Sequence, residues 1–433
     1  MPWDFATEPE FQEKLDWVAA FVKGEVEPLD LGLPHDLIYD KRHPVHEEVV
    51  RPLQEQVKGQ DLWACHLGPE LGGKGYGQLK LALLNEILGR SSWAPSVFGS
   101  QAPDSGNAEI LAHYGTDEQK ARYLEPLLEG RISSSFSMTE PQAGSDPKEF
   151  QCRAARDGDE WVISGEKWFS SNFRYAEFAI VMAISNPDTS VYEGASMFLV
   201  PTDTPGVEIV RNVGLMGEAP GEGAHAYVRY NDVRVPADAL LGGEGQAFVI
   251  AQTRLGGGRI HHAMRTVGMC RRALDMMGER ALSRTTQGEV LAKKQMVQDA
   301  IAESWIQLHQ FRLQVLHAAW VIDQSDSHRA RLEIAGVKVA TPKVLHDITY
   351  RAMHLHGALG VSNEMPFAGM WIAAPIMGIA DGPTEVHKVT VARQVLKDYE
   401  PVDTLFPSQH LPDRVAEARA RFAHLLEREV GNL

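Results

Sequence analysis

The residues that could do chemistry begin with an acid at a chain junction. Asp381 is followed by Gly382 and Pro383, which end one element and start the next, so its carboxylate would stand where a substrate can reach it. A carboxylate in that position can act as a general base. The same pattern also fits a helix cap, because Asp before a first-turn Pro is a common helix start. The segment alone leaves both interpretations open.

A second candidate is the run Gly68-Pro-Glu-Leu-Gly-Gly-Lys74-Gly75, which nearly matches the phosphate-binding pattern GxxxxGK[ST]. Gly75 has no hydroxyl for Mg²⁺, and the run lies between two helical patterns rather than between a strand and a helix. We therefore predict a Gly-rich turn rather than a nucleotide triphosphatase.

Metal and disulfide chemistry are disfavoured. Cys65, Cys152 and Cys270 lie far apart and form neither CxxC nor a Cys/His spacing. His354 and His356 lack carboxylate or thiolate companions, so packing or hydrogen bonding is the better interpretation of both. We predict no metal site and a reducing compartment.

Charge and hydropathy limit the partners. The 433 residues carry a formal charge of -16, which argues against a nucleic-acid or anionic-membrane binder. The first residues are acidic and interrupted by prolines, and no apolar run approaches the ~20 residues that span a bilayer. We expect a cytoplasmic protein without a membrane span, in which a local Arg or Lys cluster meets any anionic ligand.

The elements that must position these residues fall into three parts. Helical periodicity dominates up to about residue 130, and short β-type runs separated by turn signals follow from 133 to 242. Strands without alternating helices predict an antiparallel sheet or barrel. Longer helices return after 246, and a broad apolar stripe from Met296 to Ile322 suits a helix in a bundle.

Four strings, in this order, resemble signatures of the acyl-CoA dehydrogenase family. Phe136-Ser-Met-Thr-Glu-Pro-Gln-Ala-Gly-Ser-Asp146 resembles (Y/F)xxTEPxAGSD, and Gly165-Glu-Lys-Trp-Phe-Ser-Ser-Asn172 resembles GxKxWxTN. Asp232-Val-Arg-Val-Pro-Ala-Asp-Ala-Leu-Leu-Gly242 resembles DVRVPxxxLLG, and Arg284-Thr-Thr-Gln-Gly288 is a variant of RxxFG. The resemblance covers about residues 5 to 400.

Three later strings are most similar to the subgroup with family members ten and eleven. They are Arg254-Leu-Gly-Gly-Gly-Arg-Ile-His-His262, His356-Gly-Ala-Leu-Gly-Val361 and Asp381-Gly-Pro-Thr-Glu-Val-His387. Those members are larger and carry a kinase-like domain ahead of the dehydrogenase. We expect this chain to hold the dehydrogenase domain only.

The resemblance implies an α+β acyl-CoA dehydrogenase fold. Its expected parts are an N-terminal α-helical domain (1–132), a middle antiparallel β-barrel or sheet domain (133–242), a C-terminal four-helix bundle domain (243–400) and a helical tail (401–433).

The implied activity is FAD-dependent α,β-dehydrogenation of an acyl-CoA to the 2-enoyl-CoA, as in fatty acid β-oxidation. Asp381 matches the family's catalytic acid and would remove the α-proton, while flavin N5 takes the β-hydride and an electron-transfer flavoprotein receives the electrons. This context favours the base over the cap. Because Asp is one methylene shorter than Glu, substrate or backbone must sit about an ångström closer.

No GxGxxG fingerprint stands between a strand and a helix, so the flavin would be held in another way. By resemblance, Phe136, Met138 and Thr139 lie along the isoalloxazine, Trp168 covers a face and Ser170 assists. Across a subunit boundary, Arg284, Gln295, His354, Gly357 and Ala358 would receive the pyrophosphate and adenine, with Pro383 and Glu385 nearby. A shared flavin implies a homodimer or homotetramer. Gln287, His354, Pro383 and Glu385 depart from the common pattern, which leaves the adenine-side contacts open.

The substrate-binding residues expected by resemblance are Ser145, Arg254, Gly256, Arg259 and Gly382. Arg254 would start the helix that lines the acyl pocket. Gly256, Gly257 and Gly258 each cost that helix roughly 1 kcal/mol relative to Ala. Either the helix kinks there, or the missing side chains let the acyl chain or pantetheine approach.

Three other functions stay open. One is a flavin oxidase of the same superfamily, acting on nitroalkanes or acyl-CoA with oxygen as acceptor. Another is elimination on a 4-phosphorylated acyl-CoA, and the third is a non-enzymatic FAD-bearing scaffold. Acyl chain length and branching do not follow from the sequence.

Overall fold

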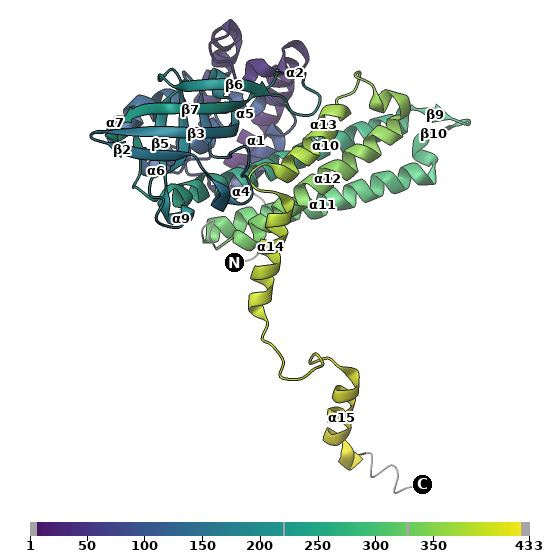
Figure 1. The fold of residues 1–433 in the computed structure, drawn as a ribbon. Coiled ribbons are helices and arrows are strands. Elements are labelled where there is room, and N and C mark those ends of the chain that lie inside the picture. Colours follow the sequence, from purple (N-terminus) through teal and green to yellow (C-terminus); the bar gives the residue numbers. More distant parts are fainter. Residues whose placement is uncertain (1–6, 220, 326–328, 426–433) are drawn as a thin grey trace, which may run out of the picture. The chain divides into compact units, whose positions relative to one another are not determined.

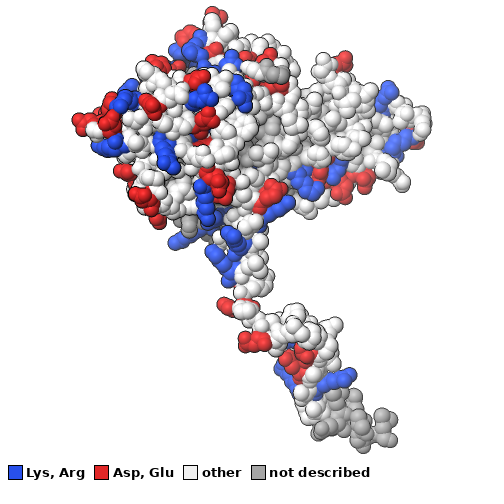
Figure 2. All heavy atoms as spheres, in the orientation of Figure 1, with Lys and Arg blue, Asp and Glu red and all other residues white. Residues whose placement is uncertain are grey.

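The computed structural model describes residues 7–219, 221–325 and 329–425. Contacts divide the chain into two units, Met1–Lys388 and Val389–Leu433, and each is described by itself. Among the described residues, no helix is both long and apolar enough to cross a membrane. Acidic and basic side chains are interspersed on the face that Figure 2 shows.

The first part of unit 1 is helical, as its apolar periodicity predicts. In α1 (Pro9–Phe21), the side chains of Phe11, Leu15 and Val18 are buried at helical spacing and join one core cluster. The helices and helical turns that follow are η1 (Val22–Val26), α2 (Glu27–Gly32), η2 (His35–Ile38), η3 (His46–Val50), α3 (Arg51–Gly59), η4 (Pro69–Leu71), α4 (Gly77–Leu88), α5 (Ala94–Val97), α6 (Asp104–Tyr114), α7 (Asp117–Gln119), η5 (Lys120–Leu124) and α8 (Glu125–Leu128).

The near match to a phosphate-binding loop is a turn, as predicted. Gly72 and Gly75 both have positive φ, and Lys74 Nζ lies 2.5 Å from Asp61 Oδ1. The lysine of the motif is therefore paired with an acid of the same region.

The middle part of unit 1 is an eight-stranded sheet with the path β6-β7-β3-β2-β4-β5-β8, and β1 pairs with β4 (Figure 1). Its strands are β1 (Ser134–Ser137), β2 (Arg153–Asp157), β3 (Glu160–Ser171), β4 (Phe178–Ile184), β5 (Ala195–Pro201), β6 (Val207–Val213), β7 (His225–Pro236) and β8 (Leu240–Leu241). The short helices η6 (Pro147–Glu149), η7 (Phe173–Tyr175), α9 (Val191–Gly194) and η8 (Ala237–Ala239) lie in its connections.

The sheet is largely antiparallel, as expected, but two pairings are parallel. β1 runs parallel to β4 along four residues, and β2 meets β4 in parallel at one pair. The β2–β3 hairpin stands between β1 and β4 in the chain, so the connection is long enough to return in the same direction. The middle part is therefore the expected antiparallel sheet apart from these two parallel contacts.

A β-bulge shapes the strand with the second signature string. The β3–β7 pairing is antiparallel and shifts register between Lys167 and Ser170. Phe169, within the shift, has φ 54°. Bulges bend a strand and redirect side chains, so this one sets the direction of Trp168 and Phe169.

The last part of unit 1 is a helical bundle. It contains α10 (Ala247–Ser283), α11 (Gln295–Gln324), α12 (Arg331–His356) and α13 (Phe367–Ile379), which run side by side in Figure 1 and share one core cluster with α4. The predicted stripe from Met296 to Ile322 lies within α11. Shorter elements are β9 (Thr285–Thr286), β10 (Glu289–Val290), η9 (Leu291–Lys293) and η10 (Gly357–Val361).

The chain continues through α14 (Thr384–Val395), η11 (Leu396–Asp398) and α15 (Leu411–Arg421). In α15 no residue is buried, as expected for a charged terminal helix. Residues 426–433 of the predicted tail lie outside the described part, and the domain boundaries at 132, 242 and 400 stay predictions.

Candidate active site

Asp381 lies at the junction between α13 and α14, in a left-handed backbone conformation. Its φ is 55°, and Gly382 follows with φ 104°. Asp is one of the few non-glycine residues that adopt this conformation readily, and glycine adopts it without steric cost.

Two side chains hold the backbone of this junction. Arg259 Nε donates to the Asp381 carbonyl oxygen over 3.0 Å, and His387 Nε2 lies 3.3 Å from the same oxygen. Burial lowers the pKa of His387 to about 4, so at neutral pH this ring is uncharged. The carbonyl is thus fixed from α10 and from α14.

The Asp381 carboxylate lines a small cavity. Its side chain is 20% exposed, and the cavity encloses about 40 Å³. The lining residues come from the loop before α4, from α6 and its approach, from α10 and from the junction, and they are His66, Ala102, Ser105, Gly106, Glu109, Arg254, Gly258, His261, His262, Arg265 and Asp381.

Positive charge surrounds the acid. Burial lowers the pKa of Arg254, Arg259 and Arg265, and the Asp381 carboxylate acts against that shift in each. His262 Nε2 lies 3.8 Å from Asp381 Oδ2, but burial lowers the pKa of His262 to about 4. At pH 7 the arginines therefore carry the positive charge, and the histidine is neutral.

Arg254 connects this cavity to the first signature string. Its guanidinium carbon lies 4.1 Å from the ring centroid of Phe136 on β1, within cation–π range. Its Nε donates to Asn107 Oδ1 over 2.9 Å. One side chain therefore touches the cavity of the predicted base and the segment predicted to lie along the flavin.

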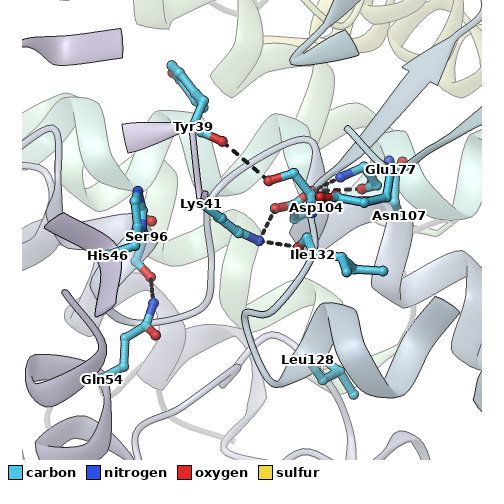
Figure 3. Close-up of polar contacts among 12 residues, drawn as sticks. Tyr39, Lys41, His46, Gln54, Ser96, Asp104, Asn107, Leu128, Ile132 and Glu177 are labelled. Atoms are coloured by element: carbon cyan, nitrogen blue, oxygen red, sulfur yellow. Dashed lines mark hydrogen bonds and ion pairs between the residues drawn. The ribbon is translucent and has the colours of Figure 1, made fainter. Parts of the chain in front are cut away.

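A polar network lies behind Asn107, the partner of Arg254, and Figure 3 shows Asn107, Asp104 and Lys41 in it. Asn107 Nδ2 donates to Ser134 Oγ over 2.9 Å, and Ser134 donates to Asp104 Oδ1 from its N–H and its hydroxyl over 2.8 and 2.7 Å. Lys41 Nζ pairs with Asp104 Oδ2 at 2.7 Å. The sequence analysis missed this network, although two polar residues one turn apart on the largely buried helix α6 were a signal for it.

Family models for acyl-CoA dehydrogenases match the chain in order. The N-terminal domain matches residues 8–131, the middle domain 135–233 and the C-terminal domain 245–396. A solved structure from Mycobacterium abscessus, assigned to the acyl-CoA dehydrogenases, is 39% identical with TM-score 0.83 and covers 91% of this chain and 100% of that one. The chain belongs to the acyl-CoA dehydrogenase family.

Two curated relatives are similar to this chain in sequence. Acyl-CoA dehydrogenase family member 11 of Rattus norvegicus is 40% identical over 402 residues, which are 91% of this chain and 51% of that protein. FadE2 of Mycobacterium tuberculosis, named a probable acyl-CoA dehydrogenase, is 43% identical over 352 residues, covering 80% of this chain and 86% of that protein. The chain spans about half the length of the family member 11 relatives.

Acyl-CoA dehydrogenases are FAD-dependent enzymes, and the predicted flavin surface fits such a group. Trp168 donates its backbone N–H to the Thr139 carbonyl over 2.7 Å, which brings the two signature strings together. Within the described structure, the buried Trp168 indole N–H has no hydrogen-bond partner, and the neighbouring Phe169 ring is 37% exposed. An aromatic surface with an unpaired donor suits a planar ring that carries acceptors. Met138 belongs to the first of these strings and is partly buried.

Ser170 is buried within the sheet, and its assisting role at the flavin stays a prediction. It has no exposed surface, and its hydroxyl lies 2.7 Å from the Ser137 hydroxyl inside the sheet. The register shift before Ser170 turns this side chain toward β1 rather than outward.

The other residues predicted to contact the flavin or the substrate differ in how far they are exposed to solvent. Those exposed on unit 1 are Ser145, Arg284, Gln295, His354, Gly357, Ala358 and Glu385. Pro383 and Gly382 are partly buried beside Asp381. Exposure is compatible with residues that a ligand or a second subunit covers, and their roles stay predictions.

Arg254 does not start its helix, because α10 begins at Ala247 and Arg254 lies two turns inside. The helix is assigned without interruption through the three glycines. A Cβ on Gly258 would lie 3.4 Å from Asp381 Oδ2, and one on Gly257 would lie 3.3 Å from Glu109 Oε2. The glycines therefore make room for two carboxylates. The surroundings of Gly256 lie outside the described structure.

Glu109 was not predicted from the sequence. Burial raises the pKa of Glu109 to about 7, against the opposing effect of the Arg254 charge. Among the described residues, its carboxylate has no hydrogen bond or ion pair. A single glutamate on α6 gives no signal in one sequence, because only the packing against α10 brings it to the cavity.

Size limits what the cavity accepts as it stands. About 40 Å³ holds one or two waters, whereas an acyl chain needs several times more room. A wider hollow of about 1030 Å³ lies at α10 and α11 beside Trp305, and no predicted site residue lines it. An acyl group can therefore enter beside Asp381 only if a lining side chain such as Arg254 moves.

We expect Glu109→Gln to stabilise the protein in a pH-dependent way. The folded state keeps the Glu109 proton up to about pH 7, whereas the unfolded chain loses it near 4.5, so this group makes stability fall as pH rises between those values. The gain from Gln should be larger at pH 8 than at pH 5 by about 2 kcal/mol. Urea unfolding at both pH values measures it.

The control is Glu303→Gln, at an exposed position of α11. It should change stability equally at both pH values. An equal change at pH 5 and pH 8 in Glu109→Gln would contradict the assignment of a raised pKa to Glu109.

Proposed function

We propose that this chain is an acyl-CoA dehydrogenase that removes hydrogens from Cα and Cβ of an acyl-CoA thioester, with Asp381 taking the α-proton. One observation carries the proposal. Arg254 lines the cavity of Asp381 and also packs on Phe136, in the segment that resembles the family's flavin-binding string.

The surroundings of Asp381 suit proton removal from a weak carbon acid. Its carboxylate is mostly buried, and the arginines beside it favour negative charge as it develops on the thioester enolate. The small cavity leaves little room for water beside the reacting carbon. The proton moves from Cα to a carboxylate oxygen of Asp381.

The cofactor in this proposal is FAD. Phe136, Met138, Thr139 and Trp168 would hold its ring, and when bound it would accept the hydride from Cβ. The exposed predicted contacts Arg284, Gln295, His354, Gly357 and Ala358 support a flavin shared between two chains, hence a homodimer or homotetramer. An electron-transfer flavoprotein as acceptor and a cytoplasmic location complete the proposal.

A second substrate class is favoured by the polar lining of the cavity. Arg254 and Arg265 face it, and two buried ring nitrogens, His66 Nδ1 and His261 Nε2, have no partner among the described residues. His66 Nε2 faces the Ser105 carbonyl, so the neutral ring presents Nδ1 as an acceptor. The donors that a plain alkyl chain would leave unmatched are those of the two arginines, at a cost of about 1–3 kcal/mol each. A phosphorylated acyl chain would satisfy them, which supports elimination on a 4-phosphorylated acyl-CoA as the alternative.

Anaerobic titration with a panel of acyl-CoA thioesters tests the proposal through bleaching of the flavin absorbance. We expect Asp381→Asn to retain FAD but to lose bleaching rate by about 100- to 10,000-fold, because a general base is removed. Asp299→Asn, at an exposed position of α11, is the control and should bleach normally. Bleaching of Asp381→Asn at the unaltered rate would defeat the assignment.

The same panel separates the alternatives. A 4-phosphorylated acyl-CoA that releases inorganic phosphate faster than unsubstituted thioesters bleach the flavin would favour elimination. Oxygen uptake in air that matches turnover would favour an oxidase. A flavin that no thioester bleaches would favour a non-enzymatic scaffold and count against both catalytic proposals.

We expect Gly258→Ala to separate stability from activity. The new methyl would stand 3.4 Å from Asp381 Oδ2 and crowd the reacting carbon, so bleaching should slow at least tenfold. Helix propensity should raise the free energy of unfolding by up to about 1 kcal/mol. Gly278→Ala, in the same helix with nothing within 4 Å of the added carbon, should show the stability gain alone. Equal activity in both variants would contradict a close approach at Gly258.

A further inference from the structure

A buried lysine lies beneath the junction that carries Asp381. Lys338 on α12 is only 4% exposed, although lysines are rarely buried unless their charge is matched. Its Nζ donates to the carbonyl oxygen of Met377. The ammonium group of Lys338 therefore binds a backbone oxygen of the neighbouring helix α13.

That oxygen belongs to the last turn of α13, where carbonyls lack partners within the helix. The Ala380 N–H donates to the Ile376 carbonyl over 3.0 Å, and Thr384 Oγ1 donates to the Gly378 carbonyl over 3.1 Å. The Met377 carbonyl lies between these two and accepts from Lys338. A cation at a helix C-terminus is also favoured by the helix dipole. The lysine thus completes the end of the helix that leads into Asp381.

Few charges act on Lys338. Burial lowers its pKa to about 8, the Asp381 carboxylate opposes that shift, and Arg259 on α10 adds to it. His262 on α10 and His387 on α14 also interact with Lys338, and burial lowers the pKa of both rings to about 4. Helix α13 contributes no ionisable side chain. Between pH 7 and 9, Lys338 is therefore the member of this group whose charge changes.

We propose that Lys338 is a positioning residue for the base: its ammonium fixes the end of α13 so that the Asp381 carboxylate is presented to the cavity. The inference rests on the proposed role of Asp381. It assigns Lys338 no contact with substrate. The charge also faces the carboxylate, so loss of the proton removes part of the attraction that holds the acid in place.

The test reads proton removal without flavin reduction. Acetyl-CoA has α-hydrogens but no β-hydrogen, so the FAD-loaded enzyme can exchange its α-hydrogens with D₂O but cannot dehydrogenate it. Mass spectrometry then follows deuterium uptake between pH 6 and 9. We expect Lys338→Met to exchange at least tenfold more slowly than the unaltered enzyme at pH 7, with FAD content retained.

The pH profile separates positioning from packing. In the unaltered enzyme the exchange rate should fall as pH rises through about 8, where Lys338 loses its proton, and Lys338→Met should lack this limb. Any change in exchange rate near pH 7 that comes from Glu109 would occur both in the unaltered enzyme and in Lys338→Met. Lys343→Met is the matched control, because Lys343 lies five residues further along α12 with its side chain 74% exposed. It should match the unaltered enzyme throughout.

Each outcome decides the inference. Unchanged exchange in Lys338→Met, or an alkaline limb that persists in it, overturns the positioning role. If Lys338→Met does not fold, Lys338→Gln replaces it in the test. If the exchange rate of the unaltered enzyme does not fall as pH rises through about 8, that result also contradicts the positioning role. Retained exchange in Asp381→Asn overturns the proposed base together with the Lys338 role. Lost exchange in Asp381→Asn with normal exchange in Lys338→Met overturns the Lys338 role alone.

Discussion

The constraint on which this site depends is an excess of positive over negative charge in the protein interior around Asp381. Arg254, Arg259, Arg265 and Lys338 are buried or partly buried, and each keeps its charge more easily because of the Asp381 carboxylate. One acid therefore serves as counter-charge to four cations that come from two helices. The same acid lies on a backbone turn held through its own carbonyl and through the helix before it. Its charge and its position are thus parts of one arrangement.

Much of the fold followed from the sequence because local patterns determine it. The apolar stripe of α11 and the helical periodicity of α1 predicted helices that the structure contains. The strands β1 to β8 lie within the predicted region 133–242, but the parallel pairing of β1 with β4 was not predicted. Residues 134–137 carry no local mark of their partner, which lies some 40 residues later in the chain.

Residues of the candidate site were predictable where they belong to a recognisable sequence string. Residues that reach the site only through helix packing were not. Asp381 and Arg254 stood in recognisable strings, and both line one cavity. Glu109 and Lys338 gave no signal, because each matters only through a helix that packs against its own. The string around Ser170 did not indicate that a register shift turns this side chain into the sheet. A string locates a segment, and the strand geometry then decides which of its atoms reach a ligand.

The closed cavity beside Asp381 has a consequence for how fast ligands associate. A pocket of about 40 Å³ cannot take an acyl group until it opens, so an opening step precedes or accompanies every binding event. For the proposed thioester substrate, we expect the observed association rate to level off at high concentration at the rate of that step instead of rising in proportion. The hydrogen bond to Asn107 and the contact with the Phe136 ring hold Arg254 at this cavity, so both contacts oppose a movement of Arg254 that would open it.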